Sequence, residues 1–534
     1  MNSSPFRSRA ILGLLAVAAL LLLLLWFSAE ERVRLLATNT AVLAANTAVL
    51  AAGTCAISLP LGTVLALLLV RTDLPARRGV GLLLVLLLFL PIYVQAAAWQ
   101  AALGVQGVFA RQGILDGMPA AVWIHAVAAV PWVAAIVAAG LLLVEPELEE
   151  EALLDASPWR VFFRVTLPRL SPALLAAALW VAMTTAGEMV VTDLFQVRTY
   201  AEVIYTSYVV DGTPSAALPG TIFTALLVVA ALALFAHLAP PSRVLSTGGR
   251  VRYRLGGWKW PALASVGLTL LVIAGVPLLS LLVKAGITVS GPGRVRSWSP
   301  TKAASIIAES PIRFRSELGW SLLVAVLAAT AALAIATSLA WWARRSRIGG
   351  IVLMFVAATF LALPAPVVGL AIIRLLNRPE FPLLAFLYDQ SIAGLWLAQL
   401  ADALPLPLLL MWYSLRSVPA ETLDSAALDG AGPLEQLRRI ALPSRLPAVA
   451  CAWLVALAIA LAEFGGSTMV YPPRATTLPI RLFDLMHYGV DDRLAGICLA
   501  QLAMFALVAW PMMWLVGWAG WLASTDSKIR NPKS

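Results

Sequence analysis

Two glutamates lie inside long apolar stretches of the sequence, where an ionisable side chain is costly. Glu188 and Glu463 are 275 residues apart; threonines lie on both sides of the first, and glycine, serine and threonine follow the second. A carboxylate inside a membrane is by default a candidate for function. We therefore expect a translocation path or its outer gate to be lined by Glu188, Glu463, Gly465 and Ser467. The alternative is that each glutamate caps a helix that is interrupted at this point.

The other residues with reactive side chains form no catalytic or metal-binding pattern. Asp402 lies in a further apolar stretch, but the equivalent position of the first half is Ala128, so we expect a local packing role. The sequence contains neither a nucleophile elbow nor a phosphate-binding loop, which argues against an enzyme and against a bound cofactor. We expect no metal site, because the candidate ligands are scattered along the chain: Cys55, Cys451, Cys498, His125, His237 and His487.

The composition is that of an integral membrane protein. Of the 534 residues, 61% are hydrophobic and only 12% are charged, which is more apolar surface than one soluble core could bury. The net charge of +10 could suggest a nucleic-acid partner. In a membrane protein, however, excess lysine and arginine usually mark cytoplasmic loops.

Apolar stretches long enough to cross a bilayer, about 20 residues each, fall into two sets of six. These sets predict an all-α protein of about twelve transmembrane helices in two tandem six-helix domains, related by a pseudo-two-fold axis. The expected spans are 10–28, 40–70, 79–104, 119–144, 171–196 and 216–239, then 261–284, 319–342, 349–375, 392–415, 446–470 and 494–520.

The basic residues predict the domain boundaries and the orientation. We expect a first domain at 1–239, a cytoplasmic linker at 240–258, a second domain at 259–525 and a cytoplasmic tail at 526–534. Arginines cluster in alternate loops, which places both termini in the cytoplasm. The stretch 287–318 is also basic, and we expect it to be an exported loop. The first hydrophobic run lacks a small residue at the −3 position of a cleavage site, so we expect an uncleaved anchor.

A polar interruption occurs twice in this apolar chain. In the second half, a short helix ends near Gly430, where the chain reverses and a positive φ favours glycine. Pro433 then begins a second short helix, which we expect to end at Leu442-Pro443. The first half repeats the pattern 274 to 275 residues earlier, with Ser157 and Pro158 as N-cap and first turn in place of the glycine. One helical elbow per half indicates a duplicated chain.

The doubled elbow resembles the EAA loop of permease subunits in binding-protein-dependent ABC importers. The family pattern is Glu-Ala-Ala, three residues, Gly, nine residues, Ile, one residue and Leu-Pro. The second elbow (421–443) matches it at the glycine, the isoleucine and the Leu-Pro, and the first (147–168) lacks the glycine and has Val165 for the isoleucine. The positions that the resemblance assigns to ATPase coupling are Glu150, Glu151, Ala152, Asp155, Ala156, Leu167, Pro168, Asp424, Ala426, Asp429, Gly430, Ile440, Leu442 and Pro443.

The resemblance implies a bacterial inner-membrane permease whose two loops dock on two copies of a cytoplasmic P-loop ATPase. That partner would use ATP and Mg, and an extracytoplasmic binding protein would deliver a small solute. Fused permeases of this size resemble those for ferric iron, and the thiamine and aminoethylphosphonate systems are close relatives. We therefore expect ferric iron as the solute, with thiamine or aminoethylphosphonate as the alternative. The alternative from a different class is an ion-coupled secondary transporter, which can also have two six-helix halves but gives no reason for the doubled elbow.

Overall fold

The chain folds as an all-helical bundle with one short hairpin. The computed structural model describes residues 40–88, 90–104, 115–211, 253–290, 295–488, 492–508 and 510–511. Within them, strand β1 (Ile287–Ser290) pairs antiparallel with β2 (Val295–Trp298), and Ile287 lies opposite Trp298. All-α architecture is therefore confirmed. The expected spans 10–28 and 216–239 lie outside the described residues, as do the tail and most of the linker.

The described part of the first half contains three long helices, α3, α6 and α9, with shorter helices between and after them. Asp116 accepts a hydrogen bond from the Gly117 amide and so caps the long helix α6. The elements are α3 (Thr40–Arg71), α4 (Arg77–Leu88), α5 (Ile92–Leu103), α6 (Gly117–Leu143), α7 (Pro146–Asp155), α8 (Pro158–Val161), the π-helical turn η1 (Phe162–Thr166), α9 (Leu167–Gly187), α10 (Val190–Leu194) and α11 (Tyr200–Asp211).

The second half begins with a helical span that is followed by the hairpin. These elements are η2 (Gly256–Trp258), α13 (Lys259–Leu270), η3 (Leu271–Gly275), α14 (Val276–Gly286), β1, β2 and α15 (Pro300–Arg313). The helices that follow are α16 (Arg315–Arg345), α17 (Arg347–Ala362), α18 (Ala365–Leu376), α19 (Pro382–Asp389), α20 (Ala393–Ala403), α21 (Pro405–Arg416), α22 (Ala420–Leu428), α23 (Pro433–Gln436), η4 (Leu437–Ala441), α24 (Leu442–Ser444), α25 (Leu446–Ala462), α26 (Ser467–Val470), α27 (Leu478–Tyr488) and a helix at 492–508.

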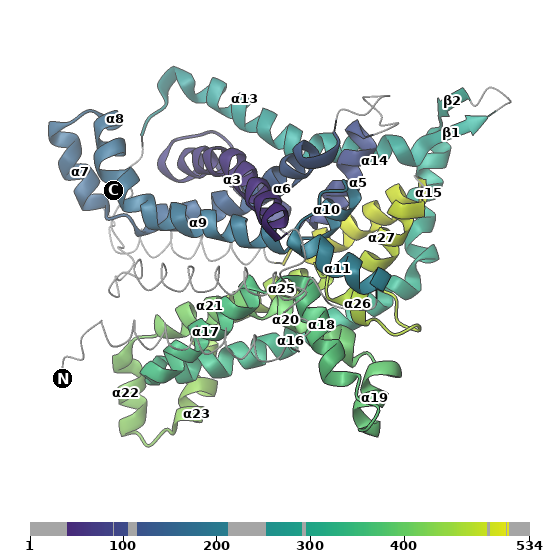
Figure 1. The fold of residues 1–534 in the computed structure, drawn as a ribbon. Coiled ribbons are helices and arrows are strands. Elements are labelled where there is room, and N and C mark those ends of the chain that lie inside the picture. The colour runs from purple at the N-terminus through teal and green to yellow at the C-terminus, as the bar shows by residue number, and fades with distance from the viewer. Residues whose placement is uncertain are drawn as a thin grey trace.

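Each half contains a three-span core built in the same order. In the first, α3, α6 and α9 pack against one another, and in the second, α16 packs against α20, α21 and α25 (Figure 1). Close crossings in the first core need glycine, because a Cβ at Gly62 would lie 2.6 Å from Val133 and one at Gly140 would lie 2.3 Å from the Cβ of Ala173. A pseudo-two-fold axis between the halves stays a prediction.

Prolines interrupt the spans more sharply than the sequence indicates. Helices α4 and α5 meet at 101°, and α17 and α18 meet at 106°, with Pro91 and Pro364 immediately before the second helix of each pair. The expectation of simple spans at 79–104 and 349–375 is therefore wrong. Proline has no N–H to bond the preceding turn and clashes with its carbonyl, so the helix breaks there. Among the described residues, five helices could span a membrane, or up to nine if each of four bent pairs counts as one.

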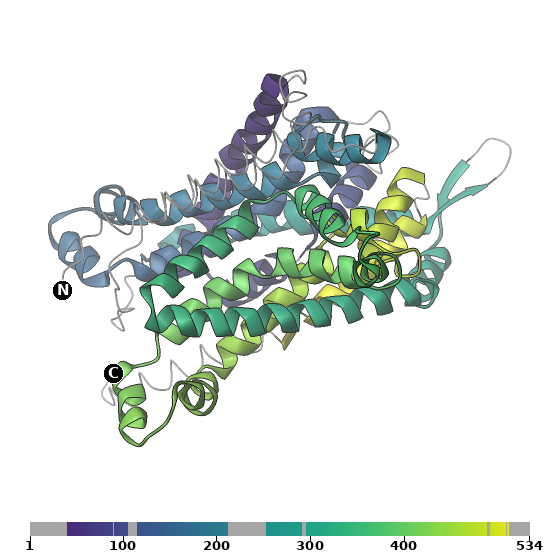
Figure 2. The same ribbon diagram turned by 60° about the horizontal axis from the view of Figure 1, so that its bottom comes forward.

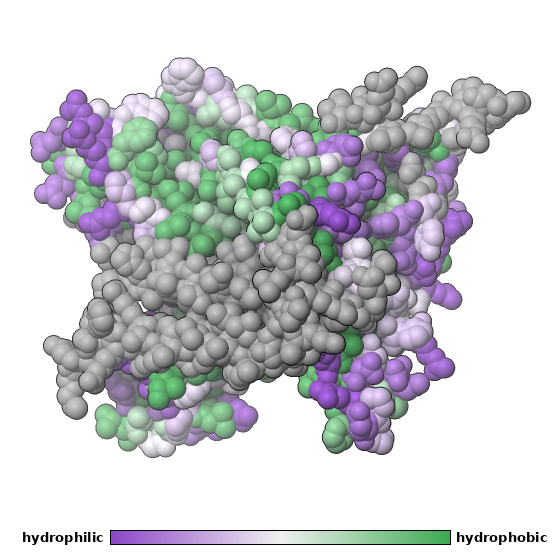
Figure 3. All heavy atoms as spheres, in the orientation of Figure 1, coloured by the Kyte–Doolittle hydropathy of each residue, from purple (hydrophilic) through white to green (hydrophobic). Residues whose placement is uncertain are grey.

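The polar elements gather at two opposite ends of the molecule. The elbow helices α7, α8, α22 and α23 lie together at one end, and the hairpin, α15 and α19 lie at the other (Figures 1 and 2). Between these ends, Figure 3 shows hydrophobic side chains over the upper part of this face. Many large apolar side chains on α3, α13 and α16 are exposed, as expected of helices that face lipid. The chain is therefore a multi-pass membrane protein.

Candidate functional site

The second elbow has the turn geometry that its glycine predicts. Gly430 follows the end of α22 with a φ of +87°, a left-handed value that disfavours other residues. The Gly430 amide donates to the Ala427 carbonyl at 3.0 Å, and the Ala431 amide donates to the Ala426 carbonyl at 2.9 Å. These two bonds form a Schellman cap. Pro433 then occupies the first turn of α23, as expected.

The first elbow reaches the same layout without the glycine. Ala156 ends α7 in an extended conformation, with a φ of −139°, and Pro158 begins α8. Ser157 occupies the N-cap position, but its side chain makes no capping hydrogen bond. Ser157 and Pro158 thus take the expected N-cap and first-turn positions, and the fixed φ of Pro158 rather than a serine hydrogen bond starts the helix.

The Leu-Pro pair lies inside a continuous helix in the first elbow and at the end of the helix in the second. Each follows a π-helical turn, in which the Leu167 amide bonds the Phe162 carbonyl and the Leu442 amide bonds the Leu437 carbonyl, five residues back. The wider turn accommodates the proline that follows, which has no amide to donate. The first elbow continues without a break from Pro158 to Gly187, whereas the second bends by 85° after Ser444. The helix end expected at Leu442-Pro443 is therefore confirmed to within one residue, because the helix ends at Ser444.

A buried ion pair anchors the first elbow to the long helix α3. Arg71 at the end of α3 lies 3.0 Å from the Glu149 carboxylate, and both side chains are almost completely buried. Thr166 in η1 donates a 2.6 Å hydrogen bond to the other Glu149 oxygen, and Arg71 also donates to the Leu141 carbonyl at 3.0 Å. One carboxylate therefore joins α3, α7 and η1. The sequence analysis missed Glu149, which precedes the residues of the EAA pattern.

Neutral hydrogen-bond partners anchor the second elbow at the equivalent place. Arg344 of α16 donates to the Leu415 and Val418 carbonyls, the latter at 2.8 Å. Arg345 donates to Gln436 at 2.7 Å, and Gln436 in turn donates to the Ala431 carbonyl at 2.9 Å. Both elbows are thus held to the end of a long helix by arginine, through a carboxylate in the first half and an amide in the second.

The coupling residues named from the sequence lie mostly on the outer surface of the elbows. The carboxylates Glu150, Glu151, Asp155, Asp424 and Asp429 are exposed. Also exposed are Gly430, Pro168 and Pro443, while Ala152, Ala156, Leu167, Ala426, Ile440 and Leu442 are half-buried.

Each elbow also presents two large apolar side chains outward. Leu154 is 84% exposed and Leu428, its counterpart 274 residues later, is 90% exposed. Trp159 and its counterpart Leu434 are 73% and 57% exposed. Leu437, three residues after Leu434, is buried instead. Exposed apolar groups beside carboxylates and at the same end of the molecule form two candidate docking surfaces.

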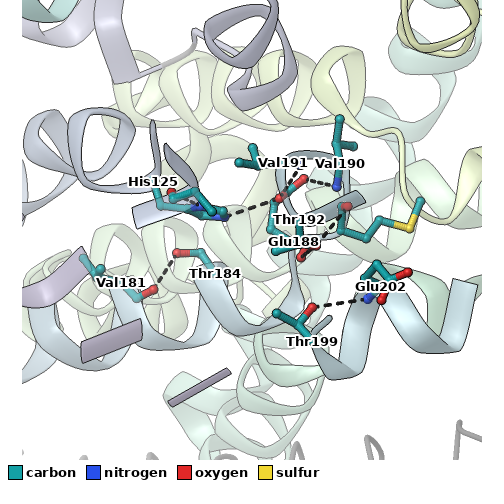
Figure 4. Close-up of polar contacts among 11 residues, drawn as sticks. His125, Val181, Thr184, Glu188, Val190, Val191, Thr192, Thr199 and Glu202 are labelled. Atoms are coloured by element: carbon teal, nitrogen blue, oxygen red, sulfur yellow. Dashed lines mark hydrogen bonds and ion pairs between the residues drawn. The ribbon is translucent and has the colours of Figure 1, made fainter. Parts of the chain in front are cut away.

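The glutamate of the first half caps a short helix after an interruption. Glu188 follows the end of α9, and its carboxylate accepts hydrogen bonds from the amides of Val190 at 2.6 Å and Val191 at 3.0 Å. From the other side, Nε2 of the buried His125 lies 3.3 Å from the same carboxylate (Figure 4). The spacing of the histidines along the chain gives no sign of this contact between His125 and Glu188.

The glutamate of the second half has the same arrangement. Glu463 follows α25 and is 5% exposed. One oxygen accepts a 2.6 Å hydrogen bond from the Gly466 amide, and the other accepts from the amide of Ser467 at 3.1 Å and from its hydroxyl. The capping alternative therefore describes both glutamates. A role in the path or gate stays a prediction.

The two glutamate turns flank the broken helix of the second half. A Cβ at Gly187 would lie 3.4 Å from Cα of Pro364, and one at Gly465 would lie 2.5 Å from Cβ of Ala365. Both turns thus lie against the backbone between α17 and α18, and the approach requires glycine at Gly465 but not at Gly187, where a Cβ would make an ordinary contact. The fold thus brings residues from the two halves to one place, which the sequence could not indicate.

Contacts between the halves also include a histidine at the end where the hairpin lies. His487 of α27 lies 3.2 Å from the Asp193 carboxylate of α10. This hydrogen bond raises the pKa of His487 above its ordinary value. His487 also bonds the Phe483 carbonyl of its own helix at 3.0 Å, so both ring nitrogens have a partner. His237 lies outside the described residues.

Comparison with known proteins agrees with the geometry. The family model described as "Binding-protein-dependent transport system inner membrane component" matches residues 58–244. The putrescine transport system permease protein PotI of Escherichia coli is 30% identical over 206 residues, which cover 37% of this chain and 72% of PotI.

Two further relatives are shorter matches. The putative 2-aminoethylphosphonate transport system permease protein PhnV of Salmonella choleraesuis is 29% identical over 106 residues, 20% of this chain and 40% of PhnV. The spermidine/putrescine transport system permease protein PotC of Haemophilus influenzae is 29% identical over 114 residues, 21% of this chain and 44% of PotC. With two helical elbows on a bundle of membrane helices, this chain belongs to the permease family of binding-protein-dependent ABC transport systems.

Proposed function

We propose that this permease subunit of a binding-protein-dependent ABC importer provides the whole membrane pathway in one chain. Two permease domains, at 1–239 and 259–525, would form its two sides. Both termini would lie in the cytoplasm, with the elbows on the cytoplasmic side and the hairpin on the extracytoplasmic side. Two copies of a P-loop ATPase would dock on the elbows, and a binding protein would deliver the solute at the opposite end.

The observation that carries this proposal is the pair of anchored elbows. Each elbow exposes a leucine, Leu154 or Leu428, and a second large apolar side chain at the same end of the molecule. The second side chain is Trp159 in the first elbow and Leu434 in the second. Each elbow is also held by arginine to a long membrane helix, through Glu149 or Gln436. A rigid element that is exposed outside and fixed inside can transmit a push from a partner to the helices.

The names of the relatives bear on the class of solute. They mention putrescine, spermidine and 2-aminoethylphosphonate, which all contain an amino group. Ferric iron, expected from the resemblance, has no counterpart among these names, and neither has thiamine. We take a small solute with an amino group as the substrate class of this importer.

Site-directed cross-linking tests the docking surfaces. A photoreactive cross-linker attached to Leu154→Cys or Leu428→Cys in native membranes should capture a protein that binds ATP and contains a P-loop. The control is Trp298→Cys, which is also exposed, at 53%, but lies on β2 at the opposite end. Capture of the ATPase from both elbows and not from β2 supports the proposal. An ATPase captured equally from β2, or no ATPase from either elbow, would contradict it.

A further inference from the structure

One carboxylate in the membrane part of the second half is open to solvent. Asp402 lies near the end of α20, where the span continues into α21 after Leu404. It is the one exposed residue between Ala393 and Leu409. Its neighbours Ala401, Ala403 and Leu404 are all buried. The local packing role expected for Asp402 is therefore wrong.

The surroundings of Asp402 place it toward the interior of the protein. Helix α20 packs against α16, α18 and α25, and the Asp402 carboxylate lies within coulombic range of the buried Glu463. Ala398, one turn before Asp402, lies beside the Gly466 turn, where an added Cβ would be 3.2 Å away. An ionisable side chain at this depth faces a water-filled space in the bundle rather than lipid, because lipid cannot solvate the charge.

A buried glutamine, Gln399, lies on the same face of the helix as Asp402, and its side-chain oxygen has no hydrogen-bond partner in the described structure. Gln399 is three residues before Asp402, a spacing that places two side chains side by side on a helix. It is 1% exposed, and its Oε1 atom accepts no hydrogen bond in the described structure. A buried carbonyl oxygen in this state is costly, and a bound donor would satisfy it.

The backbone at this point provides further acceptors. Pro405 and Pro407 have no N–H groups. The carbonyls of Ala401 and Ala403, which would accept those bonds in a regular helix, therefore lose their usual donors. Carbonyl oxygens that lack their helical donors, beside a carboxylate, are a familiar way to hold a cation inside a membrane.

We propose that Asp402 and Gln399, with the carbonyl oxygens of α20 that lack their helical donors, bind the ammonium group of the transported solute on its way through the membrane. The inference rests on the proposed importer function and assigns its substrate class as an amine that is protonated at neutral pH. An ammonium group has three donors and no acceptor, so one carboxylate and neutral carbonyl oxygens match it.

The same arrangement disfavours other cargo. A bare trivalent metal requires several anionic ligands, but Asp402 offers only one carboxylate here. Glu463 does not supply a second, because both of its oxygens already accept hydrogen bonds. A purely anionic solute is repelled by Asp402. The equivalent positions of the first half are Ala128 and His125, and His125 contacts Glu188. The acidic site therefore belongs to one half.

A labelling experiment tests the site without depending on transport. Leu406→Cys lies one turn after Asp402 and is half-buried. In membranes containing the full chain, this cysteine is labelled with two methanethiosulfonate reagents, one carrying a positive trimethylammonium-ethyl group and one a negative sulfonatoethyl group. After correction for their intrinsic rates, the positive reagent should react about ten-fold faster than the negative one. The preference should vanish in Leu406→Cys with Asp402→Asn. Mass spectrometry of the modified peptide separates this site from Cys55, Cys451 and Cys498. No reaction, or a preference that Asp402→Asn leaves unchanged, would overturn the site.

An uptake experiment tests the substrate class. The complex purified from native membranes is reconstituted in liposomes with its binding protein and ATP, and is offered putrescine, 2-aminoethylphosphonate, thiamine and ferric citrate separately. We expect ATP-dependent uptake of an amine-bearing solute, and a loss of about ten-fold or more with Asp402→Asn. The control Asp389→Asn removes an exposed charge at the end of α19 and should transport normally.

The outcomes separate the two proposals. ATP-dependent uptake of ferric citrate alone, or amine uptake that Asp402→Asn does not reduce, would overturn the ammonium site and leave the importer intact. Uptake that is independent of ATP would overturn the importer function, while the labelling preference would still report on the site.

Discussion

The Arg71–Glu149 pair is the most consequential single contact in the first elbow. Both groups are buried, so removing the carboxylate leaves the guanidinium without its counter-charge. We expect Glu149→Ala to destabilise the protein by about 3–5 kcal/mol, seen as a lower melting temperature in detergent and as weaker ATPase binding. Glu151→Ala, two residues along and exposed, should cost less than about 0.5 kcal/mol. Equal effects of the two substitutions would contradict the anchoring role.

His487 predicts a pH dependence of the contact between the halves. Its hydrogen bond with Asp193 raises the pKa of His487 in the folded chain. The pair therefore stabilises the fold fully below the unfolded pKa of about 6.5, and this contribution is lost as the pH rises through the raised value. Melting temperatures at acid and alkaline pH should differ less in His487→Gln than in the wild type. Asp193→Asn should have the same effect, and an unchanged pH dependence in both variants would refute the contact.

At the residue level, the sequence predicts what depends on local backbone chemistry. Gly430 and Pro433 lie where a positive φ and a first-turn proline were expected, because these preferences belong to the residues themselves. Glu149 and His125 were missed because their partners, Arg71 and Glu188, come from distant helices. Spacing along one helix gives no indication of such contacts.

Among the elements, the second elbow depends most on one glycine. A β-branched residue at Gly430 must adopt the left-handed conformation, at a cost of about 1–2 kcal/mol or more. We expect Gly430→Val to reduce the amount of ATPase that copurifies with the chain. Ala156→Val and Gly432→Val, at positions with negative φ, should leave it nearly unchanged. The same loss in all three variants would show that the turn conformation is not the cause.

The crossing of α6 and α9 makes a separate prediction about packing. A methyl group at Gly140 would lie 2.3 Å from Cβ of Ala173, so the helices must move apart. We expect Gly140→Ala to lower stability by about 1–3 kcal/mol, measured as thermal unfolding in detergent. In contrast, Gly79→Ala, in the exposed α4 with nothing within 4 Å, should be neutral or slightly stabilising. Equal destabilisation by the two substitutions would argue against the close crossing.

The helical spans themselves were predictable, because long apolar runs in a membrane have few alternatives to the helix. The breaks at Pro91 and Pro364 were not. A proline in a membrane helix can be accommodated by neighbouring helices or can break the helix, and the outcome depends on packing that the sequence does not show. The glutamate turns beside Pro364 illustrate this, since Gly187 and Gly465 come from different halves.

For the molecule as a whole, the two similar elbows have different connections to the membrane helices. The first continues straight into α9, whereas the second bends by 85° before α25. The first is anchored through the carboxylate of Glu149 and the second through the amide of Gln436. If two copies of one ATPase dock on the elbows, as proposed, each would therefore push on an elbow that is connected to its membrane helix in a different way. We expect the elbow variants of the two halves to reduce coupling unequally.

The composition of the complex tests the central claim most directly. The tagged chain, purified from native membranes in mild detergent, should have a native mass that corresponds to one permease chain with two copies of a P-loop ATPase. Mass spectrometry of the components identifies that ATPase. A chain without any ATPase, whose transport persists after ATP depletion and collapses with the ion gradient, would contradict the importer and identify a secondary transporter.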